Sequence, residues 1–103
     1  VARELGKRGI AFICTREKAG EDSLGPQLKE IFGGVYIANE RFTKEQANAW
    51  LDEGKADAVA FGIPYIANPD LVQRLRQDAP LNEPRPELFY AKGAEGFTDY
   101  PSL

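Results

Sequence analysis

Three short, continuous apolar runs constrain the fold of this sequence more than any other feature. They are Ile10–Cys14, Val35–Ala38 and Ala58–Phe61, and their first residues lie 25 and then 23 residues apart. A continuous apolar run, unlike an alternating one, is typical of a strand buried on both faces of a parallel sheet. The gaps are long enough for a helix between successive strands, whereas hairpin strands recur about every eight to twelve residues. The runs therefore predict an α/β fold with a parallel sheet.

Helix signals fill the gaps between the runs and follow the last one. Thr43, with Gln46 three residues later, predicts a capping box at a helix start, and Gly54 marks the end of that helix. Asn68, followed by Pro69 and Asp70, predicts the cap and first turn of a helix that ends near Gln77. Weaker signals predict a helix over Leu24–Phe32 and the last turns of another over Val1–Gly6.

The last part of the chain follows a different pattern. From Ala79 onward, proline and glycine are frequent, and the aromatic residues Phe89, Tyr90, Phe97 and Tyr100 lie among them. A flexible linker would be polar, so we expect an extended, irregular tail that packs against another surface. We interpret residues 1–103 as part of a single domain, with β/α units over 1–78 and the tail over 79–103. An eight-unit β/α barrel needs roughly 250 residues. A chain of about a hundred residues therefore has the length of about three such units.

Composition excludes several classes of function. The 103 residues contain no histidine, which rules out Ser–His and Cys–His nucleophiles and histidine-based metal sites within this chain. The single cysteine, Cys14, rules out an internal disulfide and favours a reducing, cytoplasmic location. A formal net charge of −3 argues against a nucleic-acid partner. The sequence contains no apolar stretch long enough to predict a membrane partner. The chain begins with Val1 and contains no methionine, so we expect a segment of a longer protein.

Two loops are candidates for ligand binding because each follows a predicted strand. One contains Asn39, Glu40 and Arg41, and the other contains Gly62 and Ile63. Ligands of parallel α/β folds bind at the carboxyl ends of strands, where glycine permits close approach and arginine can pair with phosphate. The alternative to ligand binding is that the glycine serves only the turn between strand and helix. Tyr90 could donate a hydroxyl hydrogen bond to a ligand, and the alternative is that it only anchors the tail.

Several segments together resemble the Old Yellow Enzyme family of flavin-dependent ene reductases. This family includes N-ethylmaleimide reductase, pentaerythritol tetranitrate reductase and the bacterial xenobiotic reductases. The resemblance covers essentially the whole chain. It extends to the spacing between the matching segments as well as to their residues. The segments that carry it are Gly34–Thr43, Ala56–Gly62, Tyr65–Leu71, Ala79–Asn82, Phe89–Tyr90 and Asp99–Pro101.

The resemblance implies a TIM barrel of which this chain supplies the C-terminal three β/α units, strands six to eight, plus the tail. It also implies FMN at the mouth of the barrel, with its phosphate held by the loops that contain Asn39, Glu40, Arg41, Gly62 and Ile63. Glu40 and Arg41 replace the glycine-containing turn common in the family, and Ile63 replaces an arginine. We hypothesise that Arg41 compensates for this missing arginine.

The implied activity is that of an FMN-dependent NAD(P)H oxidoreductase that transfers hydride to activated alkenes, nitroesters or nitroaromatics. Tyr90 would line the substrate side of the flavin, and no catalytic residue of the family falls within this chain. The fragment alone should therefore be inactive, and its expected partners are a small-molecule substrate and the missing N-terminal part of the barrel, or a second copy. The metal-free redox chemistry belongs to the flavin.

Two alternatives differ in class from this interpretation. One is another phosphate-binding TIM-barrel enzyme, from which the tail over residues 80–103 distinguishes the ene reductases. The other is a non-catalytic α/β assembly module, which would be a monomer with cooperative unfolding and no exposed apolar surface.

Overall fold

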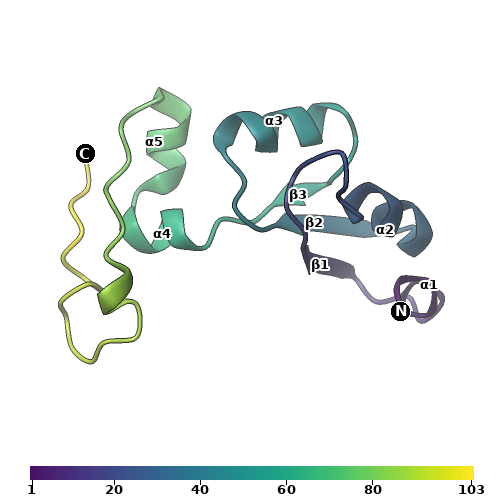
Figure 1. Ribbon diagram of the computed structural model, residues 1–103, viewed down its shortest axis with the longest axis horizontal. Helices are drawn as coiled ribbons and strands as arrows, with labels where there is room; N and C mark the ends of the chain where they lie inside the picture. The colour runs from purple at the N-terminus through teal and green to yellow at the C-terminus, as the bar shows by residue number, and fades with distance from the viewer. The chain divides into compact units, whose positions relative to one another are not determined.

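The computed structural model describes all 103 residues, Val1–Leu103, and divides them into two units (Figure 1). The first unit, Val1–Phe61, contains α1 (Ala2–Lys7), β1 (Phe12–Arg16), α2 (Gly25–Phe32), β2 (Val35–Asn39), α3 (Lys44–Asp52) and β3 (Ala58–Val59). The second unit, Gly62–Leu103, contains α4 (Ile63–Ala67), α5 (Leu71–Gln77), the 3₁₀ turn η1 (Pro86–Leu88) and the tail. None of the helices combines the length and the apolar character needed to cross a membrane.

The first unit contains the parallel sheet that the apolar runs predict. Its strand order is β1-β2-β3, and both pairs are parallel, with Phe12 opposite Val35 and Ile37 opposite Ala58. The first strand begins two residues later than the first apolar run, and β3 is shorter than predicted. Pairing continues just past β3, since Ala60 N–H donates to Ala38 O over 2.8 Å. The α/β class is therefore confirmed.

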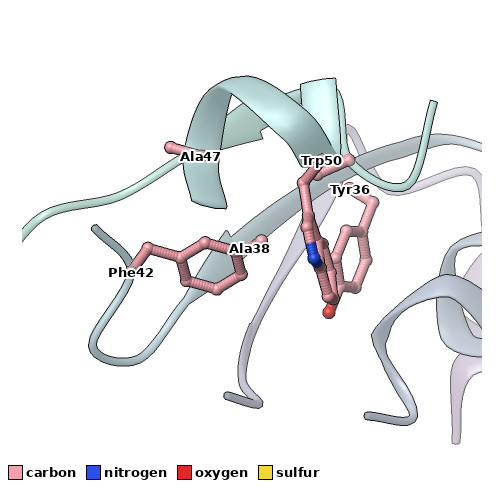
Figure 2. Close-up of a cluster of buried hydrophobic side chains, with 6 residues drawn as sticks. Tyr36, Ala38, Phe42, Ala47 and Trp50 are labelled. Carbon is pink, nitrogen blue, oxygen red and sulfur yellow. The ribbon is translucent and has the colours of Figure 1, made fainter. Parts of the chain in front are cut away.

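The core lies between one face of this sheet and the helices α2 and α3. Tyr36 and Ala38 on β2 are buried there, beside Trp50 of α3 and Phe42 (Figure 2). The Phe42 and Trp50 rings meet edge to face, with centroids 5.0 Å apart. A Cβ atom at Gly25 would lie 2.8 Å from the Tyr36 hydroxyl and 3.0 Å from the Trp50 ring, so only glycine permits this approach of α2.

The opposite face of the sheet is exposed, contrary to the prediction of burial on both faces. Phe12 is 53% exposed, Val35 is 47% exposed, and Cys14 is exposed. Successive side chains of a strand point to opposite faces, so these residues point away from the covered face of Tyr36 and Ala38. The prediction was wrong for this chain because its own helices cover only one face.

The helix start at Thr43 is confirmed. Gln46 N–H donates to Thr43 Oγ1 over 3.1 Å, and Thr43 N–H donates to Gln46 Oε1 over 3.1 Å. The two residues thus satisfy two amides that the first turn of a helix leaves without partners.

The predicted cap at Asn68 was wrong. Helix α5 begins at Leu71 with Asp70 at its N-cap, and Asn68 instead terminates α4. The Asn68 amide group is engaged elsewhere: it donates to Pro64 O over 2.8 Å and accepts from Asn82 N–H over 2.8 Å. This completely buried side chain therefore joins α4 to the tail rather than starting α5.

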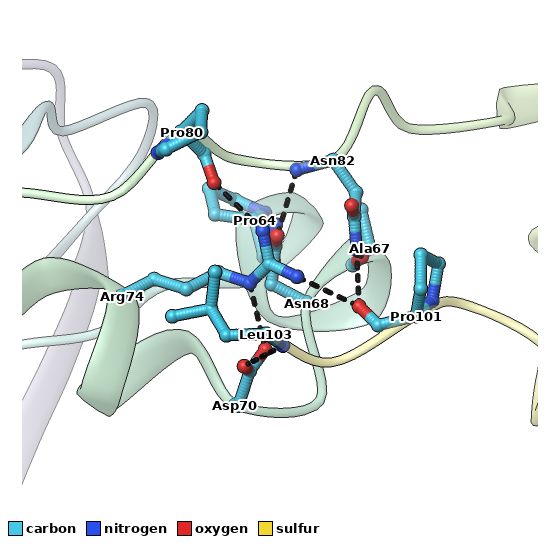
Figure 3. Close-up of polar contacts among 9 residues, drawn as sticks. All are labelled: Pro64, Ala67, Asn68, Asp70, Arg74, Pro80, Asn82, Pro101 and Leu103. Carbon is cyan, nitrogen blue, oxygen red and sulfur yellow. Dashed lines mark hydrogen bonds and ion pairs between the residues drawn. The ribbon is translucent and has the colours of Figure 1, made fainter.

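The guanidinium of Arg74 holds the second unit together (Figure 3). This side chain is only 5% exposed, and it donates to Asp70 Oδ1 over 2.7 Å, to Pro80 O over 2.7 Å and to Pro101 O over 2.8 Å. Asn82 adds bonds to Ala67 O over 2.9 Å and to Pro101 O over 2.8 Å. These bonds tie two distant points of the tail to α4 and α5.

The aromatic residues of the tail behave differently from one another. Tyr100 is buried, its hydroxyl accepts from Arg85 N–H over 2.8 Å, and the Arg85 guanidinium lies 4.4 Å from its ring centroid. In contrast, Phe97 is 82% exposed and Tyr90 is fully exposed. Tyr100 is therefore packed within the second unit, whereas the packing expected of Phe97 and Tyr90 stays a prediction.

Candidate functional site

The carboxyl edge of the sheet in the first unit brings together side chains from two loops. β1 ends at Arg16 and β2 ends at Asn39, and these two residues are register partners. Glu17 N–H donates to Asn39 O over 3.0 Å, which extends the pairing beyond β1. Because the strands are parallel, the loops that follow them leave the sheet at the same edge. Arg16 is thereby placed beside the predicted ligand loop of Asn39, Glu40 and Arg41.

The turn after β2 has a backbone conformation that favours glycine, although it contains none. Glu40 has a φ of 116° and Arg41 has a φ of 56°. Non-glycine residues in such regions cost about 1–3 kcal/mol each and occur mainly where the surroundings enforce them. The family resemblance implied a glycine-containing turn at this position, and here Glu40 and Arg41 adopt positive φ values that glycine adopts readily.

Glu40 lies between two arginines. Its Oε2 is 2.9 Å from Arg16 Nε, and its Oε1 is 3.6 Å from Arg41 Nε. The hydrogen bond from Arg16 is the main cause of a lowered pKa for the Glu40 carboxyl, and the charge of Arg41 adds to it. The Glu40 side chain is 18% exposed, whereas Arg16 and Arg41 are 80% and 75% exposed. Two exposed guanidinium groups, one at the end of β1 and one on the turn, thus surround one ionised carboxylate.

An open depression of about 700 Å³ lies at the same edge. Its walls are formed by Arg16, by the loop of residues 17–23 and by Glu40. Two of the lining side chains are cationic and four are anionic, namely Arg16, Lys18, Glu17, Glu21, Asp22 and Glu40. This depression therefore favours an anion only where its carboxylates are neutralised.

The remaining predicted site residues belong to the second unit. Gly62 is the N-cap of α4, a helix of five residues in which Ile63 is 50% exposed and Pro64 occupies the first turn. The first amides of a helix have no acceptor within it, so the Ile63 N–H is available to a ligand by geometry. Tyr90 is fully exposed, just beyond η1. The structure thus brings Asn39, Glu40 and Arg41 together in the first unit, whereas Gly62, Ile63 and Tyr90 belong to the second unit.

The pairing of Arg16 with Glu40 escaped sequence reasoning. The two residues are 24 positions apart, and the sequence alone does not pair them. One signal was present, since each residue lies at or just beyond the end of an apolar run, and parallel strands bring such ends together. The anchoring role of Arg74 had no comparable signal.

Comparison with known proteins identifies similar chains over the whole sequence, although no protein-family model matches it. The chain is 45% identical over its full length to a Leishmania infantum protein named as a flavin mononucleotide-dependent alkene reductase, and it covers 29% of that relative. It is 43% identical, over 74% of its length, to 12-oxophytodienoate reductase 2 of Arabidopsis thaliana, of which it covers 21%.

Solved structures share the fold as well as the sequence. The old yellow enzyme of Trypanosoma cruzi matches 99% of the chain with a TM-score of 0.90 and 38% identity. Morphinone reductase matches 99% of it with a TM-score of 0.88 and 41% identity. The chain covers 28% and 29% of these two structures, so it spans less than a third of either enzyme. Over its full length, the chain matches segments of Old Yellow Enzyme family members in sequence and in fold.

Proposed function

We propose that the protein containing this chain is an FMN-dependent alkene reductase, and that this chain supplies part of the FMN phosphate site. The observation that carries the proposal is the exposed Arg41 guanidinium on a strained turn at the carboxyl edge of the sheet. A relative named as a flavin mononucleotide-dependent alkene reductase, 45% identical over the full chain, supports the choice of ligand.

In this proposal the three strands are the sixth to eighth of a TIM barrel. The loops that follow β2 and β3 then contain Asn39, Glu40, Arg41, Gly62 and Ile63. The parallel pairing of β2 with β3 supports this assignment, since it directs the carboxyl ends of both strands to one edge of the sheet. Such loops bind phosphate in many TIM barrels.

The donor set at this edge fits a phosphate group. A guanidinium offers several N–H donors and a permanent positive charge, and Arg41 is exposed enough to turn toward a ligand. The apolar side chain of Ile63 supplies no such donor. Arg41 thus supplies the cationic donor that the neighbouring loop lacks.

The activity proposed for the whole protein follows from the bound flavin. When bound, FMN supplies the redox chemistry, taking hydride from NAD(P)H and delivering it to an activated alkene or a nitro compound. Tyr90, fully exposed here, would form one wall of the substrate pocket. The partner of this segment is then the rest of the barrel, or a second copy of the chain.

The test measures FMN affinity in the complete protein. Loss of one charge-assisted contact at an exposed site should weaken FMN binding about tenfold in Arg41→Ala. Arg41→Lys, which keeps the charge, should lose less. Arg8→Ala removes an equally exposed arginine outside the site and serves as the matched control. An Arg41→Ala affinity within twofold of the parent would contradict the proposal.

A further inference from the structure

Glu40 poses an electrostatic problem for the proposed phosphate site. A carboxylate beside a phosphate repels it, and the adjacent depression already has more anionic than cationic side chains. The lowered pKa of Glu40 keeps the carboxyl ionised, so the charge has to be balanced by neighbouring groups rather than removed by a proton. The identity of the balancing group therefore matters for binding.

Arg16 is the stronger of the two partners of Glu40. Its Nε–Oε2 distance is 2.9 Å, against 3.6 Å for the Arg41 pair. The backbone of Arg16 is fixed by its register with Asn39 and by the bond from Glu17 N–H to Asn39 O. The sheet thus holds one end of the ion pair, while Arg41 lies on the turn itself.

We propose that Arg16 is a positioning residue that neutralises Glu40 and thereby leaves Arg41 available for a phosphate. This inference rests on the proposed function, because it assumes that the phosphate binds beside Arg41. Without Arg16, the Glu40 carboxylate has Arg41 as its remaining ion-pair partner and draws that guanidinium away from the ligand. Arg16 therefore acts through Glu40 and does not itself contact the phosphate.

A double-mutant cycle on the complete protein tests this arrangement. The dissociation constant of FMN is measured for the parent, Arg16→Ala, Glu40→Gln and the double variant, by quenching of flavin fluorescence on the apoprotein. Arg16→Ala should weaken FMN binding about fivefold to tenfold, and Glu40→Gln should strengthen it because a charge that repels the phosphate is removed. The double variant should bind as Glu40→Gln does, because no carboxylate is left to neutralise.

Two further measurements separate a phosphate effect from damage to the fold. Riboflavin, which lacks the phosphate, should bind equally well to the parent and to Arg16→Ala. The loss of FMN affinity should also shrink in high salt, because the pair is exposed and therefore screened. Arg16→Lys, which keeps the charge, should retain most of the affinity.

Each contrary result has a distinct meaning. Arg16→Ala could weaken FMN binding by the same factor in the parent and in the Glu40→Gln background. In that case Arg16 acts directly on the ligand or the fold, and the inference is overturned. It is also overturned if Arg16→Ala leaves FMN affinity unchanged, or weakens riboflavin as much as FMN. An unaffected Arg41→Ala variant instead refutes the proposed function, whatever Arg16 does.

Discussion

Truncation of Arg74 should strongly destabilise the second unit. Arg74→Ala removes three bonds from a side chain that is 5% exposed. The substitution leaves the Asp70 carboxylate and the carbonyls of Pro80 and Pro101 without this donor. Unpaired buried polar groups are costly because they have lost water without gaining a partner.

The size of the effect follows from what each acceptor retains. Asp70 keeps the Leu103 N–H, 2.8 Å from Oδ2, and Pro101 O keeps the Asn82 amide at 2.8 Å. Pro80 O loses the donor that the structure gives it. Breaking a buried ion pair by removing one partner costs about 3–5 kcal/mol, and the retained bonds place this case near the lower value, about 3 kcal/mol.

Urea denaturation of the purified protein measures the change in unfolding free energy, and hydrogen exchange of the Asn82 and Leu103 amides locates it. Arg76→Ala, an exposed arginine on the same helix, is the matched control and should stay within about 0.5 kcal/mol of the parent. Arg74→Lys should fall between the two, because an ammonium lacks the planar fork of a guanidinium. A loss in Arg74→Ala within about 1 kcal/mol of the control would refute the reasoning.

Two smaller effects follow from other contacts. Thr43→Ala removes the N-cap acceptor of α3 and should cost about 1 kcal/mol of unfolding free energy in urea denaturation, whereas Thr43→Ser should cost little, and equal losses would contradict the capping role. The pKa values of Asp70 and Asp99 are lowered, first by the Leu103 N–H and by the Arg85 guanidinium respectively. The folded protein therefore binds fewer protons than the unfolded chain, so stability should fall as the pH drops below the ordinary Asp range near about 4. Asp99→Asn should flatten urea midpoints measured against pH, and an unchanged slope would exclude this contribution.

The parallel sheet could be predicted because its signal is local and repeated. The runs beginning at Val35 and Ala58 became β2 and β3, and their spacing required parallel pairing. Exposure could not be predicted in the same way. Phe12 and Val35 are as apolar as buried strand residues, and which of them is covered depends on packing partners rather than on their own segments.

The place of the candidate ligand loop after a strand could be predicted, but its geometry could not. Asn39, Glu40 and Arg41 were identified by their place after a strand, which sequence patterns show. The positive φ values of Glu40 and Arg41 were hidden because neither residue is glycine. The Arg16–Glu40 pair joins residues 24 positions apart, and helix-cap rules consider only near neighbours. Asn68 shows the same limit, since its bond to Asn82 outweighed its local preference for a cap.

Glu40 and Arg41 carry both the charge and the backbone strain of their turn, which limits how the turn can change in evolution. Replacing either residue by glycine would relieve a strained φ while also removing a charge, so one substitution changes two properties. A change to alanine would also remove a charge but would leave the positive φ strained. Glycine at position 41 would leave Glu40 paired with Arg16 alone, whereas glycine at position 40 would leave two arginines without their shared carboxylate, so the two replacements differ in their electrostatic consequence.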